Sequence, residues 1–94
     1  MRIRSIAHRG LRRLYEKNSP KGLSAEVVDK LRKMLAFLEA MENPAELRSL
    51  PLWKAHVLTG DRKGTWSLHV TRNWRLTFRV EDEEIVELNV EDYH

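Results

Sequence analysis

The sequence contains no cysteine. This absence excludes disulfides, thiol nucleophiles and cysteine-based zinc sites, and it is typical of proteins from a reducing compartment. No run of apolar residues approaches the roughly 20 that a membrane-spanning helix needs, and the N-terminal segment lacks the apolar centre of a secretory signal. We therefore expect a cytoplasmic protein with no membrane contact, whose chemistry depends on His, Tyr, Arg, Lys or carboxylate groups.

Glycine and proline are also scarce, with four and three residues among 94. With 41% hydrophobic and 33% charged residues, the composition is that of a folded globular protein rather than a disordered one. No repeat, low-complexity tract or linker interrupts the chain. Its length and composition predict one domain over residues 1–94.

Positive charge is missing from the last part of the chain. Residues 80–94 contain seven Asp and Glu but no Lys or Arg, whereas residues 1–79 contain all 17 Lys and Arg and the other seven acids. A basic body suggests a polyanionic partner, because Lys and Arg gain affinity by displacing the counterions of a phosphate backbone. Composition alone leaves a merely solvated basic surface equally open.

Apolar residues recur at helical spacing in the first half of the chain. This pattern predicts a short basic helix over residues 8–17 and a longer helix that Ser24 is well placed to cap. Asn43, followed by Pro44 and Glu46, predicts a third helix of about two turns. The opening residues 1–7 indicate either a short strand or the lead-in to a helix.

Beyond Pro51 the pattern alternates, which predicts strands over residues 54–58, 65–70, 73–80 and 85–90. Core-facing positions are expected in the last two strands at Trp74, Leu76, Phe78 and Val80, and at Val86, Leu88 and Val90. The chain therefore predicts an α+β fold, with a small antiparallel or mixed β-sheet, two or three helices on one face and the other face partly open.

Alternation also places Arg75 and Arg79 on the open face, beside Ser67 and His69 of the neighbouring strand. The planar fork of arginine suits a phosphate, because it donates two hydrogen bonds and stays charged near neutral pH. Further basic residues are expected on the edges and loops of the same sheet: Lys54, Arg62, Lys63 and Arg72. Together these side chains predict a surface that binds RNA phosphate.

Histidine is the natural general acid or base near neutral pH, and the chain has His8, His56, His69 and His94. Two imidazoles and an arginine are sufficient for metal-free RNA cleavage. One imidazole takes the proton of the attacking ribose 2′-OH, the other protonates the leaving 5′-oxygen, and the arginine stabilises the phosphoryl oxygens. The alternative is a non-catalytic RNA- or ribosome-binding module with incidental histidines.

A metal site would need Asp92 and His94, which share one side of an extended strand, together with His56. The chain contains no H-E-x-x-H motif, and nearby arginines would repel a cation. We therefore expect neither a metal nor another cofactor. A DNA-binding repressor is also disfavoured, because no helix-turn-helix pattern is evident.

The segment "HVLTGDRKGTWSLHVTRNWRLTF" and the terminal "DYH" resemble the HigB (host inhibition of growth) toxins, a branch of the RelE-like superfamily of type II toxin–antitoxin systems. The resemblance covers nearly the whole chain and implies a RelE-like fold. It also implies a ribosome-dependent endonuclease that cuts mRNA in the ribosomal A site. The implied partner is an antitoxin of the HigA type with a helix-turn-helix domain, through which alone the toxin would reach operator DNA.

Position by position, the resemblance implies an active site of His56, Arg75, Asp92, Tyr93 and His94. Arg75 would stabilise the phosphate, His56 and His94 would serve as acid and base in an order left open, Tyr93 would contact a nucleotide, and Asp92 would orient a histidine or accept a proton. Thr59 departs from the family pattern, which often has Lys there. Strict alternation would also send Tyr93 to the face opposite Asp92 and His94, unless the strand ends or twists after Val90.

The acidic residues within 80–94 lead to a further expectation about RNA binding. Negative charge beside a phosphate-binding face should discourage loose binding of free RNA and confine activity to the ribosome, where other contacts supply affinity. On this interpretation, removal of the charges of Glu83 and Glu84 should change the affinity for free RNA.

Overall fold

The computed structural model describes residues 1–92 of the chain. In this range the elements follow the order α1 (Arg9–Lys17), α2 (Ala25–Ala40), the 3-10 segments η1 (Pro44–Ser49) and η2 (Pro51–Trp53), β1 (His56–Val57), the 3-10 segment η3 (Gly60–Arg62), β2 (Trp66–His69), β3 (Trp74–Glu81) and β4 (Glu84–Asp92). The four strands pair antiparallel in the order β1-β2-β3-β4.

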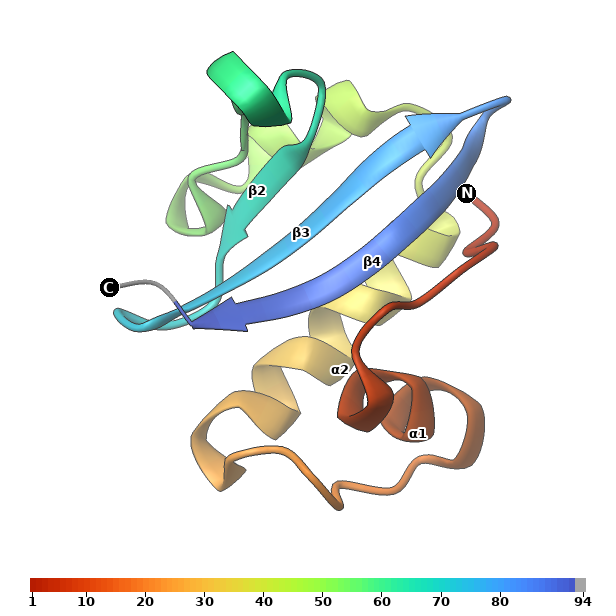
Figure 1. Ribbon diagram of the computed structural model, residues 1–94, viewed down its shortest axis with the longest axis vertical. Coiled ribbons are helices and arrows are strands. Elements are labelled where there is room, and N and C mark those ends of the chain that lie inside the picture. The colour runs from red at the N-terminus through yellow and green to blue at the C-terminus, as the bar shows by residue number, and fades with distance from the viewer. Residues whose placement is uncertain (93–94) are drawn as a thin grey trace.

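The N-terminal segment runs along β4 at the edge of this sheet (Figure 1). Ile3 bridges to Ile85 and Ile6 to Leu88, both in parallel orientation, so residues 1–7 lie extended against β4 rather than leading into α1 as helix. The four-stranded sheet is antiparallel, with these two isolated parallel bridges at its edge, and the expected α+β architecture is confirmed.

Helix α1 begins after His8, whose Nδ1 accepts a hydrogen bond of 3.1 Å from the amide of Leu11. Helix α2 begins after Ser24, but the Ser24 side chain makes no capping hydrogen bond, so the expected side-chain cap is wrong although its position is right. The third helix is confirmed as η1, where Asn43 accepts from the Ala45 amide at 2.8 Å and Glu46 accepts from the Asn43 amide at 2.9 Å.

The core lies between the helices and one face of the sheet. Leu31, Leu38 and Leu47 of the helical layer are fully buried, as are Leu68 and Leu76 of β2 and β3. Residues that alternate with these along the strands, among them Ser67 and Thr77, point away from the helices. This opposite face of the sheet is the one that carries polar side chains.

Strand β4 contains a β-bulge, and for this reason not every side chain expected to face inward at the start of the strand does so. Glu87 adopts a left-handed conformation with φ of 55°, and the pairing shifts between Thr77 and Arg79. Before the bulge, Ile85 packs in the core cluster, whereas Val86 is buried outside that cluster and pairs with Arg79. The expected alternation therefore holds for Leu88 and Val90 but is wrong for Val86.

The strand expected over residues 54–58 is reduced to His56–Val57. Lys54 has a φ of 46° and ends η2 in the left-handed region, so the extended run cannot begin before residue 55.

None of the helices formed by residues 1–92 has both the length and the apolar character needed to cross a lipid bilayer.

Candidate functional site

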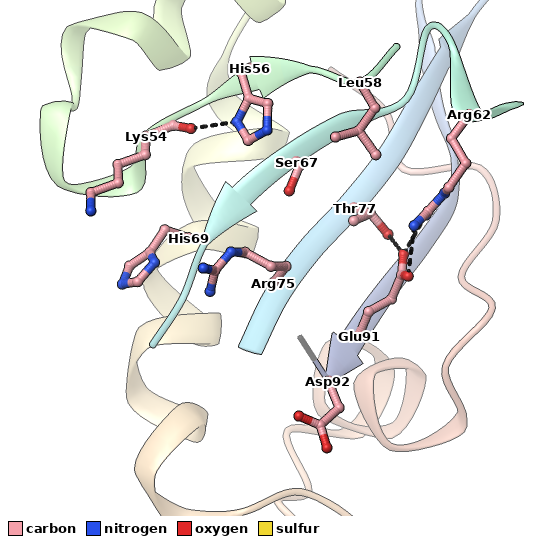
Figure 2. A pocket seen from close by; sticks show the side chains of 10 residues that line it. All are labelled: Lys54, His56, Leu58, Arg62, Ser67, His69, Arg75, Thr77, Glu91 and Asp92. Carbon is pink, nitrogen blue, oxygen red and sulfur yellow. Dashed lines mark hydrogen bonds and ion pairs between the residues drawn. The ribbon is translucent and has the colours of Figure 1, made fainter. Parts of the chain in front are cut away.

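A pocket of about 250 Å³ opens on the polar face of the sheet (Figure 2). Its walls come from every strand, from Lys54 at the end of η2, from Leu58 and from Arg62 of η3. The lining residues are Lys54, His56, Leu58, Arg62, Ser67, His69, Arg75, Thr77, Glu91 and Asp92.

Strand register brings most of these residues together in two rows. In one row His56 lies opposite Ser67, which lies opposite Thr77. In the next row His69 lies opposite Arg75, which lies opposite Glu91. Directly opposed side chains on one face have Cβ atoms about 5 Å apart, so His69 and Arg75 lie side by side, while His56 lines the same pocket from the neighbouring row.

Arg75 is held by the hairpin that precedes β3. Its Nη1 donates to the carbonyl of Thr71 at 2.7 Å and to that of Trp74 at 3.0 Å. These carbonyls belong to the turn itself, so the guanidinium is oriented by a short, local structure before any ligand arrives. A preoriented fork loses less side-chain entropy when it binds an anion.

The two imidazoles of the pocket are placed differently. The Nδ1 of His56 lies 2.9 Å from the carbonyl of Lys54, and because a carbonyl only accepts, Nδ1 carries the proton and Nε2 of neutral His56 is an acceptor. For His69, burial and then the positive charges of Arg75, Lys54 and Lys30 lower the pKa below its ordinary value of 6.5. His69 is therefore neutral near pH 7.

An ion pair closes one side of the pocket. Arg62 donates from Nη1 to Oε1 of Glu91 at 2.9 Å and from Nη2 to Oε2 at 2.5 Å, and the Thr77 hydroxyl donates to the same carboxylate (Figure 2). The hydrogen bond from Arg62, followed by that from Thr77, holds the pKa of Glu91 below its ordinary value of 4.5 despite partial burial. Glu91 is thus ionised at neutral pH.

The structure brings some of the expected site residues together and leaves others apart. Lys54, His56, Arg62, Arg75 and Asp92 line the pocket, whereas Lys63, Arg72 and Arg79 do not. Tyr93 and His94 lie outside the described residues. Strand β4 continues past Val90 and ends at Asp92, which pairs with Trp74 and is exposed at the mouth of the pocket.

Arg79 lies on the same face but beside a different depression, which Glu87 and Asn89 also line. Its Nε is 3.7 Å from a carboxylate oxygen of Glu81 and 4.0 Å from one of Glu87, and its Nη1 donates to the carbonyl of Lys63. Arg79 is therefore already compensated by acids of its own hairpin.

Sequence reasoning missed Glu91 as a site residue. The signal was present, because the alternation that directs Leu88 and Val90 inward directs Asn89 and Glu91 to the open face. Ser67 and His69 were placed on that face correctly, but Thr77 is almost fully buried beneath the Glu91 carboxylate, which alternation could not indicate.

A second groove adjoins the pocket and shares Lys54 and His69 with it. The groove lies between α2 and η2 and is lined by Lys30, Lys33, Met34, Leu52, Trp53 and Val70 as well. Leu52 is 83% exposed at its edge. The basic surface around the pocket thus extends towards α2.

Within residues 1–92, no group of three or more His, Asp or Glu side chains has positions suited to holding a metal ion. The set weighed above, His56 with Asp92 and His94, includes a residue outside that range.

Comparison of the chain with known proteins finds close relatives of one kind. The family described as "RelE-like toxin of type II toxin-antitoxin system HigB" matches residues 4–94. The protein called endoribonuclease HigB from Proteus vulgaris is 39% identical over 92 residues, which cover 98% of this chain and 99% of the relative.

Solved structures of similar fold are more distant in sequence. YafQ from E. coli strain BL21(DE3) has a TM-score of 0.62 at 14% identity, over 98% of this chain and 93% of that one. The YoeB–YefM toxin–antitoxin complex from Staphylococcus aureus includes a chain with a TM-score of 0.60 at 15% identity, over 100% and 99%. The match over nearly the full length shows that this chain belongs to the family of HigB-type, RelE-like toxins of type II toxin–antitoxin systems.

Proposed function

We propose that this toxin is an endoribonuclease that cleaves mRNA on the ribosome by metal-independent acid and base catalysis. The observation that supports the proposal is the pocket on the open face of the sheet that His56, His69 and Arg75 line together. The name of the Proteus vulgaris relative, an endoribonuclease, supports the same reaction.

In the proposed mechanism Arg75 binds the scissile phosphate and stabilises the charge that develops on its oxygens. The ribose 2′-OH attacks the phosphorus, its proton passes to a base, and an acid protonates the leaving 5′-oxygen. An imidazole can serve as acid or as base, and in the neutral form of His56 Nε2 is oriented to accept a proton. His94 is the proposed second imidazole, with Asp92 and Tyr93 as its supporting residues.

The proposed partners follow from the toxin family to which the chain belongs. The ribosome supplies the mRNA in its A site and places the activity in the cytoplasm. An antitoxin of the HigA type, carrying a helix-turn-helix domain, holds the toxin inactive and links it to operator DNA. Among relatives of the same fold, the Staphylococcus aureus YoeB structure is a heterotetrameric complex with YefM.

Cleavage in a ribosome-containing extract, with the 5′ ends of the products mapped by primer extension, tests this proposal. We expect discrete cuts with the wild-type protein and a loss of at least about 100-fold in rate for Arg75→Ala, a typical cost of removing one transition-state hydrogen-bond donor. Lys63→Ala serves as the control, because Lys63 lies outside the pocket.

Two further arms distinguish the alternatives. Cleavage that stops with a chelator, at magnesium levels that keep ribosomes intact, would contradict the metal-independent mechanism. Growth inhibition and ribosome binding that persist unchanged in Arg75→Ala and in His94→Ala would favour a non-catalytic ribosome-binding module.

A further inference from the structure

The acidic residues of the C-terminal region occupy two separate places in the fold. Glu81, Asp82 and Glu84 lie at the β3–β4 hairpin, where Arg4 pairs with all three. The pocket is lined by Arg75, Glu91 and Asp92 from the other end of these strands. Of the acids from residue 80 to 92, only Glu91 and Asp92 line the pocket.

That Glu83 and Glu84 oppose RNA binding stays a prediction, but both lie at the hairpin end of β3 and β4, away from the pocket. Glu84 pairs with Arg2 and Arg4 at 3.4 and 3.3 Å, and Glu83 lies in the turn of the hairpin. Exposed charges separated by more than a Debye length of about 10 Å interact weakly. The acids placed to act on a phosphate in the pocket are therefore Glu91 and Asp92, and Glu91 is the one that pairs with Arg62.

We propose that Glu91 is an internal substitute for a phosphate group, which occupies the fork of Arg62 in the free toxin and must be displaced before single-stranded RNA can use that arginine. This inference rests on the proposed function. It adds a residue that lowers the affinity of the toxin for RNA outside the ribosome.

The geometry supports a substitute anion because carboxylate and phosphate compete for the same edge of a guanidinium. Both terminal nitrogens of Arg62 are bonded to the two oxygens of Glu91, which is the paired arrangement that a phosphate would also adopt. Thr77 is 3% exposed, and its hydroxyl fixes the Glu91 carboxylate from below. The Glu91 side chain is thus held in one position by Arg62 and Thr77 and does not exchange among many rotamers.

The charge balance of the pocket also supports Glu91 as a substitute anion. Its charged lining residues are the cations Lys54, Arg62 and Arg75 and the anions Glu91 and Asp92. Glu91 offsets Arg62, so one positive charge more becomes available when Glu91 turns away or is neutralised. Arg62 lies in η3, a short segment in the loop between β1 and β2, from which its side chain can shift towards a ligand.

The test compares wild type with Glu91→Gln, a change that keeps the shape of the side chain and an oxygen for Thr77. The probe is a short, fluorescein-labelled, single-stranded RNA with 2′-O-methyl riboses, which cannot be cleaved by 2′-OH attack, and binding is followed by anisotropy from about 50 to 200 mM salt. We expect Glu91→Gln to bind roughly tenfold more tightly at low salt, as for one additional charge-assisted contact. The salt slope should steepen by about 0.7, the value for one more phosphate neutralised on a single strand.

Glu83→Gln is the matched control, because it removes the same charge at the far end of the sheet. The double variant Arg62→Gln/Glu91→Gln should lose the gain, since the arginine that Glu91 occupies is then absent. Thermal unfolding of each variant verifies that it is folded.

The outcomes separate this inference from the proposed function. Wild-type protein that binds or cleaves RNA while Glu91→Gln binds no more tightly, or no more tightly than Glu83→Gln, overturns the inference alone. A gain that survives in the double variant also overturns it. RNA that neither wild type nor Glu91→Gln binds, with no cleavage on ribosomes, overturns both.

Discussion

His69 and Arg75 affect each other because they are direct cross-strand neighbours on the open face. Burial keeps the His69 imidazole neutral, and the guanidinium of Arg75 strengthens that preference, so both act to lower its pKa. A neutral imidazole beside a fixed cation can accept a hydrogen bond from a ribose hydroxyl or a base without adding a second positive charge.

The substitution Arg75→Gln should raise the pKa of His69. It removes the positive charge that lowers this pKa the most, while the burial of the ring stays in place. The measurement is an NMR titration of the imidazole proton signals of His69. Arg72→Gln is the control, since Arg72 is not among the charges that shift His69. An unchanged His69 pKa in Arg75→Gln would mean that the charge of Arg75 does not contribute to the shift.

At the scale of the elements, the bulge in β4 decides which side chains reach the pocket and which reach the core. Glu87 adopts the left-handed conformation there, and its amide donates to the hydroxyl of Ser5 at 2.9 Å. The bulge places Ile85 and Leu88 in one core while Glu91, further along, stays on the polar face. The strand can thus serve both faces along its length.

Replacement of Glu87 by valine should destabilise the protein by about 1–2 kcal/mol, because a β-branched residue is disfavoured at positive φ. Glu87→Asn should cost much less, since asparagine tolerates that region. The free energy of unfolding from urea titration of both variants measures the difference. Equal values for valine and asparagine would show that the bulge relaxes when the side chain is changed.

At the scale of the whole molecule, opposite charges from the two ends of the sequence meet. Arg2 pairs with Glu84 at the hairpin, and Arg4 pairs with Glu81, Asp82 and Glu84. Arg4 is separated from Glu81 by 77 positions of the sequence and from Glu84 by 80. The parallel bridges of Ile3 and Ile6 hold this segment against β4. These three acids therefore pair with the N-terminal segment and lie away from the pocket.

The substitution Arg4→Ala should lower the free energy of unfolding by only about 0.5–1 kcal/mol, because Arg4 is 39% exposed and solvent screens its ion pairs. Most of that difference should vanish in about 1 M NaCl, where the Debye length is about 3 Å. Urea unfolding at low and high salt gives both values, and Arg9→Ala, which changes a basic residue without such pairs, is the control. A difference that persists in high salt would indicate lost packing instead.

Much of the fold could be predicted from the chain, because the decisive patterns are local. The stripe of apolar residues in α2 and the alternation from Trp66 to Phe78 each depend on neighbours within a few positions. The same alternation placed Arg75 and His69 together on the open face. The capping pair of Asn43 and Glu46 was visible for the same reason.

The remaining features depend on contacts between distant residues. The short extent of β1 follows from the left-handed turn at Lys54, and the position of Val86 from the bulge at Glu87. Local propensity does not indicate either conformation, because Lys and Glu adopt positive φ only where the surrounding structure imposes it.

By itself, the sequence determined the α+β architecture and the polar face of the sheet with Arg75 on it, since side-chain period is a local property. His56 was predicted as a site residue through the family resemblance. Only the tertiary structure decided that Arg62 meets Glu91, which lies 29 positions away, over the hydroxyl of Thr77. It also decided that the acids at the hairpin lie apart from the pocket. The physical reason is that an ion pair depends on where a loop and a strand end come to lie, and packing of the whole chain sets that distance.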